Sequence, residues 1–201
     1  MKIEIENRER DIRTVRTICT EFKTREENGE RHIAGYFAVF DSIYEIAPGM
    51  TESVAPGAFS RTMSGDIRAL TNHDTTLVLG RTKAKTLTLT EDAHGLFGDV
   101  TINPNDQDAV NTWERVNRGD VDQCSFGFEI VNEDTEYRED GSIHWTIKDV
   151  NLYEVSVCTF PAYKETNVSA RCAQRDALKA RSLDAWKMQQ KNKLKGEQKN
   201  A

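Results

Sequence analysis

Short runs of alternating apolar and polar residues make up most of the chain as far as Pro161. Side chains of a β-strand alternate between two faces, so these runs predict strands rather than helices. Asn28-Gly29 and Asp140-Gly141 can supply the positive φ values of tight hairpin turns. The expected strands cover residues 16–23, 32–40, 66–72, 75–79, 86–90, 96–102, 122–130, 143–147 and 152–160.

Two short helices are expected among these strands. The first would begin at Pro56 and stop at Gly65, because proline suits a first helical turn. The second would have Asn105 as its N-cap, an apolar stripe at helical spacing, and Gly119 at its end. Residues 41–53 are expected to form a loop. The pattern therefore predicts a β-rich α+β domain, a closed barrel or sandwich with a few flanking helices.

The pattern changes after Arg171, where helix-forming and basic residues replace the alternating runs. Residues 171–201 hold nine Lys and Arg against three Asp and Glu, a net charge of +6, whereas the whole chain carries −6. We therefore expect a charged N-terminal arm over residues 1–15, one domain over 16–171 and a basic helical tail over 172–201. The acidic body argues against nucleic acid as the main partner.

Composition narrows the class of protein further. The 201 residues suffice for one domain with a substantial core. The longest nearly apolar run, residues 33–40, is far too short to cross a membrane, and the charged N-terminus shows no secretory signal. Four scattered cysteines favour reduced thiols over a disulfide framework. Because metal-ligand spacing is absent, neither a metal nor a cofactor is expected.

The segment from Asp122 to Ile130 is the first candidate for chemistry. Alternation would place Cys124, Phe126, Phe128 and Ile130 on one face, which has the character of a core, and Ser125, Gly127 and Glu129 on the other. Gly127 has no side chain, which would leave room beside the Ser125 hydroxyl. A serine becomes a nucleophile only when a base lies next to it.

His73 and Glu154 are the candidate partners of Ser125, since each interrupts an otherwise apolar, strand-like segment. A buried carboxylate needs a hydrogen-bond donor, and an imidazole N–H is a suitable one. A carboxylate that orients a histidine, which in turn deprotonates a serine, is a triad found on unrelated folds. Each residue also has an ordinary structural explanation: a satisfied hydroxyl, a capping histidine and an ion-paired glutamate.

Other residues compete for these roles. His32, His94 and His144 are alternative bases, although His94 and His144 lie near turn signals. Cys124 is the stronger nucleophile in principle, but alternation directs it toward the core, where a thiol packs as a small apolar group. Asp74 adjoins His73, yet neighbours in an extended segment point to opposite faces, so Glu154 is preferred as the orienting acid.

Six segments together resemble the prohead maturation proteases of tailed bacteriophages, a family of the herpesvirus-assemblin type. The resemblance covers roughly Arg16 to Arg171, and six motifs in the same order are more specific than any one alone. They are Ile33-Ala34-Gly35-Tyr36-Phe37-Ala38-Val39-Phe40-Asp41, Val54-Ala55-Pro56-Gly57-Ala58-Phe59, Asn72-His73-Asp74 with Leu79-Gly80-Arg81, Ser125-Phe126-Gly127-Phe128, Leu152-Tyr153-Glu154-Val155-Ser156 and Pro161-Ala162-Tyr163.

The resemblance implies an assemblin-like fold and a serine endopeptidase. His73 matches the family's catalytic histidine and Ser125 its nucleophile, and Glu154 falls on the acidic position of a later motif. Cys124 departs from the methionine common in the family. The Leu79-Gly80-Arg81 segment, taken as a turn, is a candidate source of an oxyanion donor or cation.

The resemblance also implies a biological setting. Such enzymes act in the host cytoplasm, inside the immature capsid, on the N-terminal scaffolding segment of the major capsid protein, on scaffold protein and on themselves. The expected partners are therefore these proteins and further copies of the chain, with no membrane involved. The alternative is a non-catalytic capsid-assembly or scaffolding module that keeps the protease fold.

Overall fold

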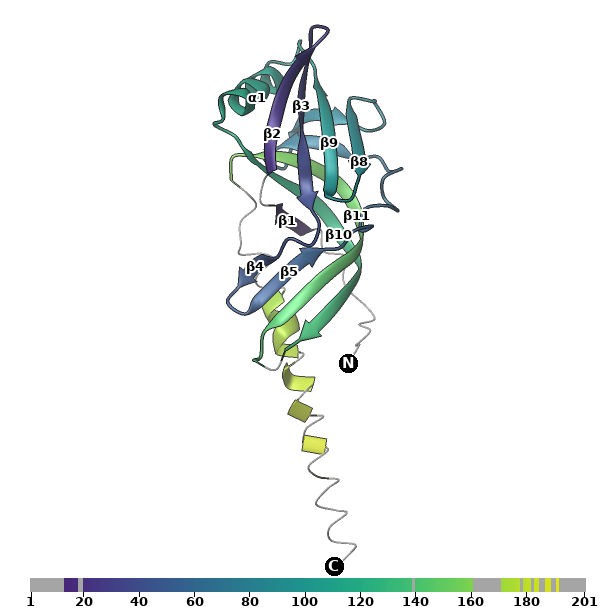
Figure 1. Cartoon of the computed structure of the whole chain (residues 1–201), viewed down its shortest axis with the longest axis vertical. Helices are drawn as coiled ribbons and strands as arrows, with labels where there is room; N and C mark the ends of the chain where they lie inside the picture. Colours follow the sequence, from purple (N-terminus) through teal and green to yellow (C-terminus); the bar gives the residue numbers. More distant parts are fainter. Residues whose placement is uncertain are drawn as a thin grey trace, which may run out of the picture. The chain divides into compact units, whose positions relative to one another are not determined.

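The computed structural model describes residues 13–17, 20–138, 140–160, 171–177, 179–181, 183–184, 187–188 and 191. The chain divides into two compact units, Met1–Tyr163 and Lys164–Ala201. The described residues of the second unit are helical (Figure 1), and no helix in the described parts is long and apolar enough to cross a membrane. The predicted division at residue 171 stays a prediction, and residues 1–12 of the predicted arm lie outside the described residues.

The first unit contains eleven strands and one α-helix among its described residues. The strands are β1 (Arg13–Thr17), β2 (Thr20–Glu27), β3 (Glu30–Val39), β4 (Tyr44–Ala47), β5 (Met50–Val54), β6 (Arg68–Thr71), β7 (Asp74–Arg81), β8 (Leu87–Glu91), β9 (Gly95–Ile102), β10 (Gln123–Tyr137) and β11 (Ile143–Cys158). The helix is α1 (Gln107–Arg118).

The larger sheet is organised around β11. Its strand order is β1-β10-β11-β5-β4, and β6, which also pairs with β7, joins β11 as well. β10 runs antiparallel along one edge of β11, whereas β5 and β6 pair in parallel with two different stretches of the other edge. The long, curved β10 and β11 lie side by side in Figure 1. β11 therefore connects segments that are far apart in the sequence.

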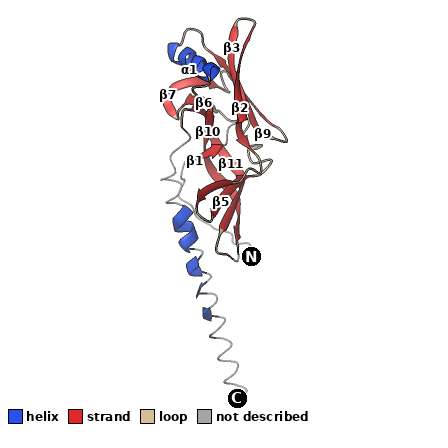
Figure 2. Ribbon diagram, turned by 60° about the vertical axis from the view of Figure 1, so that its left-hand side comes forward, coloured by secondary structure: helices blue, strands red, loops and turns tan. Residues whose placement is uncertain are grey.

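The smaller sheet has the order β2-β3-β9-β8, and all its pairs are antiparallel. Asn28 and Gly29 join β2 to β3 with φ values of 54° and 82°, which confirms the predicted hairpin turn. Strand residues of both sheets share one hydrophobic core, in which Phe59 packs edge-on against Phe126. The strands and helix in Figure 2 confirm the β-rich α+β class, and the sandwich stays a prediction. No closed ring of paired strands is found among the described residues, so the barrel is unconfirmed.

Helix α1 covers one part of this core. Asp106, not the predicted Asn105, is its N-cap, because the Asp106 side chain accepts the backbone N–H groups of Asp108 and Ala109. Gly119 ends the helix with φ 85°, as predicted. The Trp113 Nε1–H donates to the carbonyl of His32 at 3.0 Å, which ties the helix to β3.

Three sequence predictions of secondary structure were wrong. Residues 41–53 are not a loop, because they contain β4 and most of β5. Residues 56–65 form successive turns with i to i+3 hydrogen bonds instead of an α-helix, and Gly57 has φ 89° within them. The strands expected at 143–147 and 152–160 are one continuous strand, since β10, β5 and β6 pair along its length.

We predict that Gly80→Ala lowers the free energy of unfolding by about 1–3 kcal/mol. A Cβ at Gly80 in β7 would lie 2.6 Å from the carbonyl oxygen of Thr86 and 3.0 Å from a methyl group of Val100, so backbone would have to move. Urea denaturation measures the change. Thr88→Ser, at an exposed position of the neighbouring β8, is the control and should stay within about 0.5 kcal/mol. Equal stability of Gly80→Ala and wild type would contradict the close approach.

Candidate functional site

The register between β10 and β11 groups the predicted site residues. Ser125 pairs with Ser156, and Gly127 pairs with Glu154. Directly opposed residues of antiparallel strands share a face of the sheet, so these four residues lie on one face. The other face enters the core, which confirms the predicted place of Cys124: its Sγ lies 3.3 Å from the Tyr36 carbonyl oxygen.

The space beside Ser125 is filled, contrary to the expectation from the sequence. A Cβ added at Gly127 would lie only 2.3 Å from Glu154 Oε1, so the glycine accommodates the carboxylate. Ser125 itself is 0% exposed. The absence of a side chain at Gly127 therefore admits Glu154 from the adjacent strand and leaves no open gap beside the hydroxyl.

His73 occupies a two-residue hairpin turn between β6 and β7. Asn72 and His73 have φ values of 53° and 61°, and the flanking Thr71 and Asp74 are paired. Turns with two positive φ values suit the twist of paired strands, and asparagine tolerates this conformation. Histidine enters it more readily than most residues but still uncommonly, so contacts with the surrounding structure help to hold His73 in place.

Three hydrogen bonds attach this turn to β11 and the residue after it. The Asn72 backbone N–H donates to the Val157 carbonyl at 2.9 Å, and Asn72 Oδ1 accepts the Thr159 N–H at 2.8 Å. The His73 backbone N–H donates to Ser156 Oγ at 3.2 Å. The turn is thereby fixed over the strand that carries Glu154.

The His73 ring contacts Glu154 directly. Nδ1 lies 2.7 Å from Glu154 Oε1, and the two side chains are 23% and 13% exposed. An ionised carboxylate can only accept hydrogen bonds, so Nδ1 carries the proton of this bond. In neutral imidazole, Nε2 then presents a lone pair that can accept a proton from another group. The structure thus brings His73 and Glu154 together, and Glu154 lies on β11, the strand paired with the one that contains Ser125.

Ser156 and Cys158 join this group and were not predicted as site residues. Ser156 Oγ donates to Glu154 Oε2 at 2.6 Å, and Cys158 Sγ lies 3.8 Å from His73 Nε2. Both were within reach of the sequence argument, because Glu154, Ser156 and Cys158 alternate along one strand and must share a face. Cys158, rather than Cys124, is therefore the thiol beside the candidate base.

The competing histidines have separate surroundings. His32 Nδ1 lies 2.9 Å from Asp99 Oδ1, and the His94 ring packs edge-on against Tyr36. A second histidine, His144, contacts side-chain hydroxyls, and the sequence did not reveal this contact.

His144 Nε2 lies 3.0 Å from Ser53 Oγ, while Nδ1 lies 2.8 Å from Thr51 Oγ1. Burial lowers the pKa of His144. A hydroxyl occupies the place that an orienting carboxylate takes at His73, so this pair lacks the acid of a triad.

Asp74 and Arg81, which the sequence analysis also considered, form hydrogen bonds with residues outside the group around His73. Asp74 Oδ1 accepts the backbone N–H and the hydroxyl of Thr76, at 2.8 Å and 2.6 Å, and these bonds lower the pKa of Asp74. Arg81 donates to both carboxylate oxygens of Asp66, and this hydrogen bonding lowers the pKa of Asp66 to about 2. Residues 79–81 end strand β7 and do not form the turn expected as an oxyanion source.

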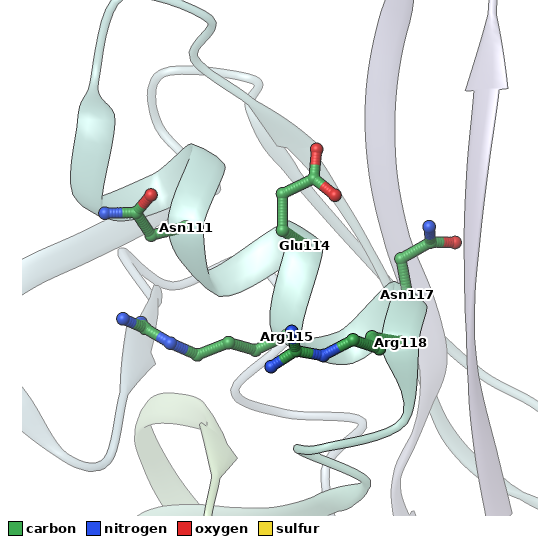
Figure 3. Close-up of a pocket in the computed structure, with 5 residues that line it drawn as sticks. All are labelled: Asn111, Glu114, Arg115, Asn117 and Arg118. Carbon is green, nitrogen blue, oxygen red and sulfur yellow. The ribbon is translucent and has the colours of Figure 1, made fainter.

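No group of three or more His, Cys, Asp or Glu in the described part of the chain could hold a metal ion. A surface depression of about 430 Å³ lies along α1 (Figure 3). Its lining side chains are all polar: Asn111, Glu114, Arg115, Asn117 and Arg118. None of them belongs to the His73 group, which consists of His73, Glu154, Ser156 and Cys158.

Comparisons with known proteins identify one family by sequence. Residues 20–181 match the family model of the caudovirus prohead serine proteases. The prohead protease of Enterobacteria phage HK97 is 26% identical over 156 residues, which cover 76% of this chain and 67% of that protein. The solved structure of the bacteriophage T4 capsid assembly protease aligns with a TM-score of 0.41 and 10% identity, over 73% of this chain and 95% of that one.

We predict that Asn72→Ala is less stable than Asn72→Gly by about 1 kcal/mol, because alanine is strained at positive φ and glycine is not. Both variants lose the hydrogen bond between Asn72 Oδ1 and Thr159, so their difference isolates the backbone conformation. Urea denaturation of the two variants gives this difference. Equal stabilities would show that the turn does not impose the left-handed conformation.

Proposed function

This chain belongs to the caudovirus prohead serine protease family, and on that premise we propose that it is a serine endopeptidase with Ser125 as nucleophile, His73 as base and Glu154 as orienting acid. The observation that carries the proposal is the 2.7 Å contact between His73 Nδ1 and Glu154 Oε1. Glu154 lies on β11, which pairs with β10, the strand that contains Ser125. The matched segment, residues 20–181, contains all three residues.

In the proposed mechanism, His73 Nε2 takes the hydroxyl proton of Ser125 as Oγ attacks the carbonyl carbon of a peptide bond. Glu154 stabilises the imidazolium that forms and keeps the ring in the tautomer with a proton on Nδ1. The imidazolium then protonates the leaving amine. A water molecule, deprotonated by the same histidine, hydrolyses the acyl-enzyme and regenerates the Ser125 hydroxyl.

Access to Ser125 requires a local change. The residue is 0% exposed, so a peptide carbonyl reaches Oγ only after the atoms that cover it move. β1 pairs with β10 along this region, with Arg16 opposite Ser125. We propose that this part of the site opens when substrate binds, a conformational step of the kind that accompanies substrate binding in many enzymes.

The proposed substrates are proteins of the immature capsid. The curated relative is named a prohead protease and the solved neighbour a capsid assembly protease. Together with the family, these names support cleavage of capsid or scaffold protein, and of the chain itself, inside the prohead in the host cytoplasm.

We predict that Ser125→Ala reduces cleavage by at least about 10⁴-fold, because the covalent step is lost. Mass spectrometry of capsid protein co-expressed with each variant, and of the protease itself, measures cleavage. Cys158→Ala is the matched control: its thiol lies 3.8 Å from His73 Nε2, so it is the competing nucleophile. This variant should keep most of its activity.

The opposite pattern, loss with Cys158→Ala and retention with Ser125→Ala, would show a thiol hydrolase. If wild-type protein cleaves nothing while folded and bound to capsid protein, the non-catalytic assembly module is the better description.

A further inference from the structure

Ser156 uses its single hydroxyl to hold both proposed partners of Ser125. Its proton goes to Glu154 Oε2 at 2.6 Å, and one of its lone pairs receives the backbone N–H of His73 at 3.2 Å. The residue is 0% exposed. One buried group therefore fixes the orientation of a carboxylate and the backbone of a histidine that is 83 residues away in sequence.

The carboxylate of Glu154 is constrained on several sides. Ser156 occupies Oε2, His73 Nδ1 occupies Oε1, and the bare Cα of Gly127 lies against Oε1 from the paired strand. Rotation of the carboxylate would break one or both hydrogen bonds. Without the Ser156 hydroxyl, Oε2 would lose this hydrogen-bond donor in a largely buried place, which would favour rotation of the carboxylate.

The same hydroxyl opposes backbone strain at His73. The left-handed conformation, φ 61°, is uncommon for residues other than glycine, and the bond to Ser156 helps to hold it. Losing it would let the imidazole shift away from its contact with Glu154. Displacement of catalytic groups by about 1 Å can reduce a rate by about 100-fold.

We propose that Ser156 is a positioning residue that sets the geometry of the His73–Glu154 pair, with Gly127 providing the space this geometry needs. The inference rests on the proposed function for its kinetic consequences only. Ser156 does not touch the reacting atoms in this scheme, and it acts through Glu154 and His73. It follows that the part of its contribution that acts through Glu154 should disappear when Glu154 is absent, while the bond to the His73 backbone remains.

The kinetic test is a double-mutant cycle on cleavage of a peptide substrate. Ser156→Ala should lower kcat by about 10-fold to 100-fold and change KM by less than about 2-fold. In a Glu154→Ala background the same change should cost clearly less than it does in the wild type, because one of the two groups it positions is gone. Ser156→Thr, which retains the hydroxyl, should recover most of the lost kcat.

Gly127→Ala approaches the same group from the other strand. The new Cβ would displace the Glu154 carboxylate while leaving Ser156 intact, so kcat should fall as it does in Ser156→Ala. Thermal unfolding of every variant checks the fold. A Ser156→Ala protein that does not fold, or a loss of equal size with and without Glu154, would show a structural role and overturn the proposal.

A spectroscopic measurement separates this inference from the proposed function. In protein with ¹⁵N-labelled histidine, Ser156→Ala should change the ring signals of His73, assigned with His73→Gln, and leave those of His144 in place. Ser53→Ala is the matched control, since it removes another buried strand hydroxyl, 3.0 Å from His144 Nε2. It should affect His144 alone.

The two hypotheses can therefore fail independently. Unchanged His73 signals in Ser156→Ala would overturn the positioning role whatever the enzyme does. Changed signals in a protein whose cleavage does not depend on Ser125 would keep the positioning role and refute the proposed nucleophile.

Discussion

The antiparallel register between β10 and β11 is the constraint on which the candidate site depends. It sets Gly127 opposite Glu154 and Ser125 opposite Ser156. A carboxylate of this size fits between the strands because Gly127 has no Cβ, and any other residue there would meet Glu154 Oε1 at 2.3 Å or closer. A slip of one residue would turn Glu154 into the core and expose Val155, which burial forbids.

A second constraint comes from β11 as the shared strand of the larger sheet. β6 pairs with β11 from Glu154 to Val157, on the edge opposite β10. The turn that follows β6 therefore begins beside Val157, and from there the His73 ring reaches Glu154. The hydrogen bonds of Asn72 and His73 to β11 then hold a conformation that histidine alone would not favour.

The surroundings of His73 and His144 show why a short distance between a histidine and a hydroxyl does not by itself identify a catalytic site. Ser53 Oγ lies 3.0 Å from His144 Nε2, but the hydroxyl of Thr51, and not a carboxylate, contacts the other ring nitrogen. At His73 that position belongs to a carboxylate, which can stabilise a charged ring. The family match over residues 20–181 covers both histidines, so the match does not separate them and the difference lies in the acid.

The sequence by itself determined the β-rich class, the hairpin at Asn28-Gly29, helix α1 with its Gly119 end, and the core face that contains Cys124. These features follow from local periodicity and turn chemistry, which adjacent residues carry. The ordered motifs also identified the family, which the match over residues 20–181 confirms.

Tertiary structure decided the rest. The local pattern predicted two strands where the structure has the single strand β11. Pairing with β10, β5 and β6 keeps β11 continuous, and no local pattern encodes these partners. The sequence indicated open space at Gly127, whereas the neighbouring strand fills that space with Glu154. It passed over Ser156 and Cys158, since their importance depends on where the turn at His73 lies above β11, a placement fixed by long-range pairing and not by any run of residues.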